Sequence, residues 1–230
     1  MERFRDLGAW VVAIMLAGAY LLTGGLKLVG SPDMVAAYGA DQVHFMPVTP
    51  EEIRRVKALG PMPVVGDLKV DQDGRASWFS HKSEEVRPYY YRVYLSVPDV
   101  TAEIAPTDRA AHFRFTYPAS DRSYLVVDGF EKGSHVQILP EERTILGYCR
   151  YNNGGVPDNF HNYFIAVFDH DFEETLTWKE GKLQEASRES EGKHVMAVVR
   201  FKTGRGEKVH VRVASSFISP EQARLNLTLE

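Results

Sequence analysis

The stretch KVHVRVASSF, residues 208–217, decides how this chain folds. In it Val209, Val211 and Val213 alternate with a lysine, a histidine and an arginine. Successive side chains of a β-strand point to opposite faces, so the pattern predicts a strand with one buried face and one wet face. The run HVMAVVRF (194–201) precedes it across the glycine-containing turn KTGRGEK (202–208). This arrangement predicts that the two strands pair as a hairpin.

The same kind of pattern recurs through residues 64–218, where short apolar-rich runs are separated by glycine, proline and aspartate turns. No helical period of useful length intervenes, which disfavours folds built from parallel strands and connecting helices. The predicted fold class is therefore mainly β, an antiparallel two-sheet β-sandwich. The predicted strands cover residues 64–70, 89–96, 100–105, 111–117, 123–128, 135–138, 143–150, 161–168, 173–178, 194–201 and 208–217.

Residues 1–30 differ in kind, because LGAWVVAIMLAGAYLLTGGL (7–26) carries no charge and matches the thickness of a bilayer. Two interpretations stay open. The segment is an apolar helix that anchors the chain in a membrane, or it is a signal peptide with a cleavage site at Ala17-Gly18-Ala19. Apolar residues continue past that site, which favours the anchor. The flanking charges set the orientation poorly, because Arg3 and Arg5 on one side face only Lys27 on the other. Export, to the periplasm or the cell surface, is expected because the strand-rich part that follows suits that side.

Residues 31–63 are predicted to be a connector that carries one short helix. The run TPEEIRRVKALG (49–60) has Thr49 as a cap, Pro50 at the first helical position and Gly60 as a stop. Proline clusters flank this run on both sides. The connector would lead from the apolar segment into the β-sandwich at residue 64.

The end of the chain, residues 219–230, is predicted to open a helix. Ser219 and Gln222 have the spacing of a capping box, and Pro220 stands at the first helical position. The apolar residues fall on two faces, Ala223 with Leu227 and Leu225 with Leu229. A helix this short is marginal in water without a packing partner. The partner is expected beyond Glu230; the alternative is a short terminal helix that docks on the sheet.

Composition excludes some classes of function. The formal net charge of −4 offers no basic stripe for phosphates, so nucleic acid is not expected as a partner. The single cysteine, Cys149, rules out an internal disulfide and a multi-cysteine zinc site, and is interpreted as a small buried strand residue. The eight histidines form no HxH or HxxxH pair, which gives no support to a metal site.

The acidic run FDHDFEE (168–174) has two interpretations. Its carboxylates with His170 suggest a metal or acid/base site, yet strand alternation puts Asp169, Asp171 and Glu173 on one face, as in a solvated sheet edge. The edge is favoured. Glycoside cleavage needs two carboxylates at a defined separation, and the sequence does not place such a pair. No catalytic residue is therefore assigned.

The loop YNNGGVPDNFHNYF (151–164) combines amides and aromatic residues, which are groups that bind sugar hydroxyls and ring faces. Tight turns use the same residues, because Asn and Asp tolerate left-handed backbone angles. Both interpretations stay open. The candidate carbohydrate-binding residues are Asn152, Asn153, Asp158, Asn159 and His161.

Several phrases in order carry a family resemblance: VVGDLKV, SWFSHKSEEVRPYYYRVYLSVPDVTAEIAPTDRAAHFRFTYP, SYLVVD, ILGYCR and VASSFISPEQARLNL. Together they resemble the N-terminal domain of glycoside hydrolase family 92, the exo-acting α-mannosidases, over about residues 64–230. Residues 20–40 also show a faint similarity to DoxX-type membrane proteins. A protein of that kind needs further membrane spans, and the sequence has no other long apolar run.

In family 92 a β-sandwich leads through linker helices into an (α/α)6 barrel, which supplies the general acid, the general base and most of a calcium site for inverting hydrolysis. The resemblance thus implies a domain of an enzyme acting on α-mannosides, present without its catalytic barrel and inactive alone. It also implies calcium for the full-length enzyme and none in this chain. Residues 219–230 would be a truncated linker helix.

The chain departs from the family pattern in front of GDLKV, where a glycine-rich, aromatic stretch that contributes to the sugar pocket is replaced by TPEEIRRVKALGPMP. Tyr89 also stands where the family has PGYY. No pocket residue is therefore carried over. A free-standing carbohydrate-binding module and a structural or interaction domain are the alternative functions.

Overall fold

The computed structural model describes residues 61–152, 155–185 and 187–230, and the backbone of residues 53–56. Within these ranges no helix combines the length and the apolarity needed to cross a bilayer. The apolar segment 7–26, with its predicted helix and cleavage site, lies outside the described residues. Its membrane contact stays a prediction.

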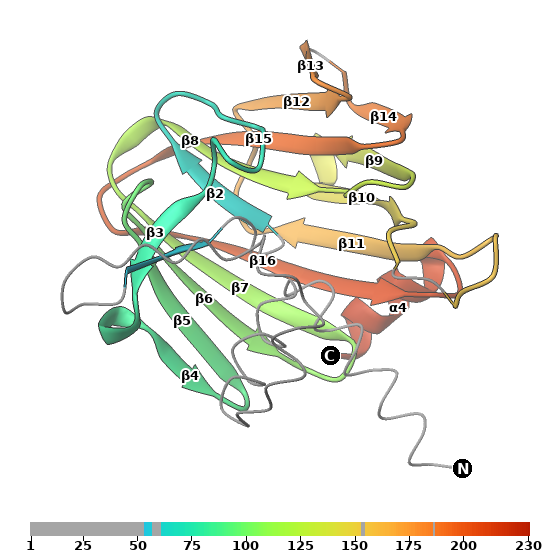
Figure 1. The fold of residues 1–230 in the computed structure, drawn as a ribbon, viewed down its shortest axis with the longest axis horizontal. Coiled ribbons are helices and arrows are strands. Elements are labelled where there is room, and N and C mark those ends of the chain that lie inside the picture. Colours follow the sequence, from blue (N-terminus) through green and yellow to red (C-terminus); the bar gives the residue numbers. More distant parts are fainter. Residues whose placement is uncertain (1–52, 57–60, 153–154, 186) are drawn as a thin grey trace.

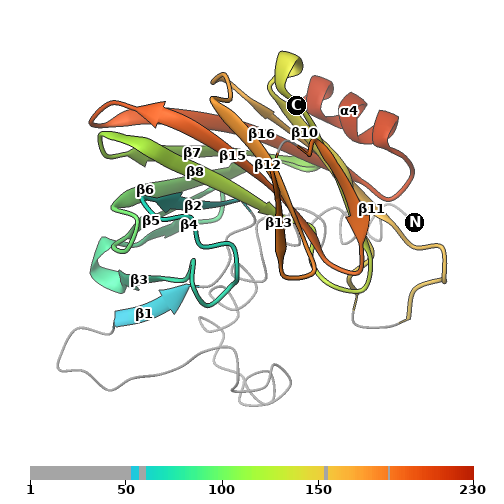
Figure 2. The ribbon, with the colours of Figure 1, turned by 90° about the horizontal axis from the view of Figure 1, so that it is seen from above.

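The described residues form two facing antiparallel sheets, as Figures 1 and 2 show, so the predicted β-sandwich is confirmed. The larger sheet has nine strands in the order β14-β9-β10-β11-β16-β7-β6-β5-β4, and the smaller has five in the order β13-β12-β15-β8-β2. The larger sheet comprises β4 (Glu85–Arg87), β5 (Tyr90–Leu95), β6 (Val100–Pro106), β7 (Ala110–Tyr117), β9 (Ser134–Leu139), β10 (Thr144–Cys149), β11 (Asn162–Phe168), β14 (Glu189–Gly192) and β16 (Glu207–Ser216). The smaller sheet comprises β2 (Pro61–Val65), β8 (Ser120–Asp128), β12 (Glu174–Lys179), β13 (Lys182–Glu185) and β15 (Val195–Thr203).

The predicted helix in the connector is wrong where the structure describes it. Residues Ile53–Val56 form strand β1, which pairs antiparallel with β3 (Ser77–Ser80). Backbone pairing with β3 overrides the weak helix preference of these few residues. The rest of the predicted helix lies outside the described residues, and β2 begins at Pro61, inside the predicted connector.

The predicted hairpin between the last two strands is also wrong. β15 pairs with β8 and β12 in the smaller sheet, whereas β16 pairs with β7 and β11 in the larger. The turn that joins them crosses from one sheet to the other. Val199 of β15 and Val211 of β16 belong to the same buried cluster, so these strands face each other across the core. The alternation of apolar and polar residues shows which face of a strand is buried. It is the same whether two strands pair in one sheet or face each other across the core, so it could not predict the pairing.

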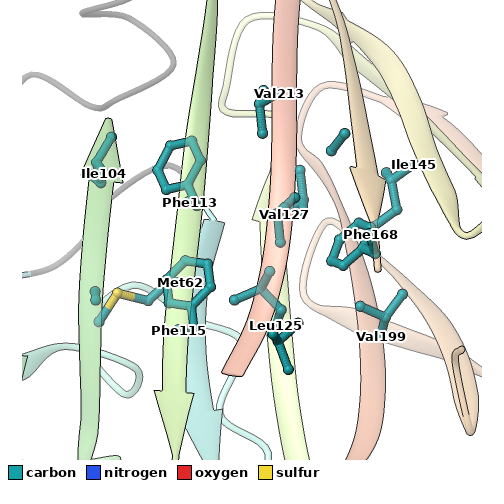
Figure 3. Close-up of a cluster of buried hydrophobic side chains, with 14 of the residues drawn as sticks. Met62, Ile104, Phe113, Phe115, Leu125, Val127, Ile145, Phe168, Val199 and Val213 are labelled. Carbon is teal, nitrogen blue, oxygen red and sulfur yellow. The ribbon is translucent and has the colours of Figure 1, made fainter. Parts of the chain in front are cut away.

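The main core lies between the sheets (Figure 3). The larger sheet contributes aromatic side chains such as Phe113 and Phe115, which are fully buried, and the smaller sheet contributes Leu125 and Met62. Burying aromatic and branched side chains from both layers is the main favourable term for such a fold. This core fixes the faces of both sheets.

Strand β15 is buried on both faces. Its residues Met196 and Val198 point away from the main core into a second cluster with Val126 and Leu176. Val70, from the segment between β2 and β3, packs into the same cluster. That segment therefore covers the outer face of the smaller sheet.

The C-terminal helix α4 (Pro220–Leu229) docks on the larger sheet beside β11 and β16 (Figure 1). Ser219 Oγ accepts from the Gln222 N–H at 3.2 Å, as predicted, but the Gln222 side chain donates to Asn226 Oδ1 instead of returning to Ser219. Ala223 and Leu227 are buried against the sheet. The expectation of a partner only beyond Glu230 is thus wrong for this face, and the alternative of a docked helix is confirmed.

Candidate functional site

A cavity of about 890 Å³ opens where one edge of the larger sheet meets the smaller sheet. Three segments that are distant in the sequence build it: the turn between β8 and β9, the end of β10, and the turn between β14 and β15. Backbone bonds hold them together, with Gly133 N donating to Lys193 O and Arg150 N donating to Gly133 O. We call it the corner cavity. It is lined by Glu131, Lys132, Gly133, Tyr148, Arg150, Glu191, Gly192, Lys193 and His194.

His194, in the lining of the cavity, is held by the buried carboxylate of Asp128. His194 Nε2 lies 2.7 Å from Asp128 Oδ1, and the Asp128 side chain is 1% exposed. Burial raises the pKa of Asp128, but the hydrogen bond from His194, the Arg75 charge and the Phe130 N–H together hold it below its ordinary value. An ionised carboxylate only accepts, so Nε2 carries the proton. Asp128 thereby fixes the tautomer and orientation of the histidine.

Behind Asp128 lies Arg75, whose side chain is fully buried and forms an ion pair with Asp128 Oδ2. Its guanidinium also donates to the Val70 carbonyl and contacts Met196 Sδ at 3.2 Å. The pair therefore links the segment covering the smaller sheet to the strand that leads into the corner cavity. A buried charge of this kind is tolerated only when it is paired.

Elsewhere in the lining of the cavity, the Tyr148 hydroxyl donates to Glu191 Oε1 at 2.6 Å. Burial, together with this bond to a carboxylate, raises the pKa of Tyr148 to about 12, so its hydroxyl keeps its proton. The ring lies 5.5 Å from that of His135 and 4.6 Å from that of His161. Arg150 donates to the Asp158 carbonyl. These contacts position the polar groups on this side of the cavity.

The corner cavity contains two carboxylates, Glu131 and Glu191, and glycoside cleavage also uses two. Both side chains are exposed, and Lys132 and Lys193 line the same cavity. A general acid needs apolar surroundings that keep its proton on at neutral pH. Neither glutamate has such surroundings.

The predicted carbohydrate-binding loop begins at the rim of this cavity. Asn152 Nδ2 donates to the Arg150 carbonyl at 2.8 Å, Lys132 Nζ donates to the Asn152 carbonyl at 2.5 Å, and His161 Nδ1 lies 2.8 Å from the Asn159 carbonyl. The carbonyl of Asp158 accepts from Arg150, as noted above. Such bonds are typical of turns. Asn153 lies outside the described residues.

The acidic run 168–174 makes its own polar cluster away from the corner cavity. Nδ1 of His170 lies 2.6 Å from Asp169 Oδ1 and Nε2 lies 3.1 Å from Glu207 Oε1. Burial lowers the pKa of His170, but the two carboxylates outweigh it and raise the pKa above its ordinary value. Glu174 instead pairs with Arg200. Asp169, Glu174 and Glu207 are thus partnered by a neighbouring histidine or arginine.

Calcium, which the family resemblance implies for the full-length enzyme, was tested against the described residues. Within them no group of three or more His, Cys, Asp or Glu side chains is placed to hold a metal ion. Calcium takes six to eight oxygen ligands, and the Asp169–Glu207 cluster is occupied by its histidine. The part of the chain that the structure describes therefore shows no set of ligands that fits a calcium ion.

Sequence reasoning missed the corner cavity. Its lining comes from three segments that are far apart in the sequence, with Tyr148 and Arg150 at the end of β10, and Glu191 and His194 at the end of β14 and just after it. Only the loop after Arg150 gave a signal, and it lies at the rim. Pairing of β14 with β9 brings Glu191 opposite His135, and strand β14 was not among the predicted strands.

Comparison with solved structures finds relatives over most of this chain. The family GH92 inverting mannosidase BT2199 from Bacteroides thetaiotaomicron is 38% identical with a TM-score of 0.70, over 77% of this chain and 23% of its own. The family GH92 α-mannosidase BT3965 from the same organism is 29% identical with a TM-score of 0.66, over 78% of this chain and 26% of its own. A search of curated proteins finds no match.

This chain therefore spans about a quarter of the length of these solved relatives. The model of the glycosyl hydrolase family 92 N-terminal domain matches residues 40–216, which include all fourteen strands of the two sheets and the whole corner cavity. The ordered phrases from VVGDLKV to VASSFISPEQARLNL predict the same family over about residues 64–230, so the family is confirmed, while the matched range begins and ends earlier in the sequence. The chain belongs to the glycosyl hydrolase family 92 N-terminal domain family.

Proposed function

We propose that this chain is the β-sandwich part of an α-mannosidase and that it acts by supporting a separate catalytic domain. The observation that carries the proposal is the 38% identity with an inverting mannosidase, over a segment that makes up only 23% of that enzyme. The remaining three quarters of such a relative would hold the acid and the base that cleave α-mannosides, and the calcium. The exposed glutamates of the corner cavity are consistent with this division of labour.

The surface around α4 supports a docking role. Its outer side leaves apolar residues in water: Phe217 is 44% exposed, Ile218 77%, Leu225 48% and Leu229 66%. An apolar patch of this kind marks a contact surface. We define these four residues as the helix patch, and its proposed occupant is the catalytic domain. The apolar segment 7–26 supports export, to the periplasm or the cell surface.

The proposal is tested by mixing this chain with BT2199 lacking its own N-terminal domain. Light scattering and calorimetry should detect a one-to-one complex. An isolated chain that binds mannosides but never the catalytic remainder would instead be a free-standing carbohydrate-binding module. A chain that only self-associates through the helix patch would be a structural or interaction domain.

A further inference from the structure

We propose that the corner cavity is a binding site for one or two sugar units, separate from the bond that the catalytic domain cleaves. That the sugar is an α-mannoside rests on the proposed function. That the ligand is a neutral polyhydroxyl compound rests on the cavity itself.

The cavity has a floor that keeps it open. Its volume of about 890 Å³ lies within the range of small-molecule sites. A Cβ on Gly133 would lie 3.1 Å from Arg150 Cδ, and one on Gly192 would lie 3.0 Å from Glu180 Oε1. Gly133 also has a φ of +110°, which disfavours other residues. Because both positions are glycine, the side chains of Arg150 and Glu180 can lie close to the backbone there, and no further side chain projects into the cavity.

The charges of the cavity favour a neutral ligand over an ion. Three cationic side chains, Lys132, Arg150 and Lys193, share the lining with two carboxylates, Glu131 and Glu191. An anion would meet the carboxylates, and a cation would meet the lysines. A sugar hydroxyl both donates and accepts, so adjacent hydroxyls can bridge a carboxylate and a guanidinium. Interleaved charges of both signs are what such a ligand requires.

The key polar groups are already held in place. The Glu191 carboxylate is fixed by Tyr148, and the Arg150 guanidinium by the Asp158 carbonyl. His194 is fixed by Asp128 and packs edge-on to Trp178, with ring centroids 5.0 Å apart. Groups that are ordered before binding lose little conformational entropy when the ligand arrives. The cavity is thus prepared for binding in the free protein.

The test is a titration of the ¹⁵N-labelled chain with methyl α-mannoside and α-1,2-mannobiose, and with inorganic phosphate as an anionic probe. The sugars should shift the amide signals of residues 131–133, 148–150 and 191–194. Arg150→Ala and Glu191→Gln should each weaken sugar binding by about tenfold or more, because the first removes a charged donor and the second replaces a charged acceptor with a weaker neutral one. Thermal unfolding checks that both variants are folded.

The matched controls are Arg87→Ala and Glu85→Gln, an exposed ion pair on β4 at the opposite edge of the same sheet. They should bind sugar as the unchanged chain does. Absence of sugar shifts, shifts confined to other residues, or a response to phosphate alone would each overturn the proposal. A chain that docks on the catalytic remainder but fails this titration would remove the sugar site and leave the proposed function standing.

Discussion

The ion pair of Arg75 and Asp128 is the residue-scale feature on which both the smaller sheet and the corner cavity depend. Arg75 anchors the covering segment, and Asp128 orients His194. Neither role is visible in the sequence, because the two residues lie far apart along the chain and in unlike contexts, one in a turn and one at a strand end. The topology of the sheets decides which buried charges meet. The alternation of apolar and polar residues along the sequence does not specify that topology.

Removing one partner of this pair should destabilise the fold strongly. We expect Arg75→Met to lower the free energy of unfolding by about 3–5 kcal/mol, because it leaves Asp128 charged and buried without its cation. The exposed pair of Arg122 and Asp67 supplies the control, and Arg122→Met should cost at most about 1 kcal/mol. Urea denaturation followed by fluorescence measures both. Equal losses in the two variants would show that burial of the pair is irrelevant.

The cluster at His170 predicts that folding stability decreases as the pH rises, whereas an aspartate whose pKa is lowered by folding makes stability increase with pH. The pKa of His170 is raised in the folded chain, so its charged form contributes stability below its ordinary pKa, and this is lost as the pH rises through the raised value. Glu207→Gln should lower the pKa of His170, as followed by NMR titration of the imidazole protons. A pKa that stays put or rises in that variant would exclude Glu207 as a cause.

At the element scale the sequence predicted which segments are strands better than it predicted how they pair. The alternation at 208–217 located β16 and its buried face, because burial is a property of one strand. It assigned β15 to the wrong neighbour, because a turn with glycines serves a crossover as well as a hairpin. Strands β13 and β14 escaped prediction, since they are short, polar and held mainly by their backbone partners.

Gly147 in β10 offers a test of the close pairing between β9 and β10. A Cβ at this position would lie 1.9 Å from the His135 carbonyl oxygen, so Gly147→Ala should destabilise the fold by about 1–3 kcal/mol. Gly204→Ala is the matched control, because its Cβ would meet only the flexible end of Glu207 at 3.3 Å. Thermal unfolding of both variants measures the difference. A Gly147→Ala variant as stable as the control would contradict the pairing described here.

The helix patch can be tested by changing its exposed residues and leaving the buried face of α4 intact. The double change Ile218→Ser and Leu225→Ser should weaken binding to the catalytic remainder of BT2199 by about tenfold or more, while unfolding stays within about 0.5 kcal/mol. Both side chains are exposed in the free chain. Leu183→Ser and Val86→Ser change other exposed apolar residues outside the helix patch and should not alter binding. Unchanged affinity in the double variant would exclude α4 from the docking surface.

At the scale of the whole molecule the described residues form a two-sheet sandwich. The sequence reached this through two independent routes, alternating strands and the ordered family phrases, and the comparisons confirm the family. The site could not be predicted in the same way, because the corner cavity forms only where three segments that are distant in the sequence meet after folding. Within the described residues its carboxylates are exposed rather than poised as an acid and a base.

Our central proposal is that this chain does not break glycosidic bonds by itself. Its most direct test is incubation of the purified chain, in calcium, with an aryl α-mannoside and with α-1,2-mannobiose, followed by release of the aryl group and of mannose. The account predicts no release above the buffer blank, and no change with Glu131→Gln or Glu191→Gln. Enzyme-like turnover by the isolated chain, abolished by either of those substitutions, would contradict it.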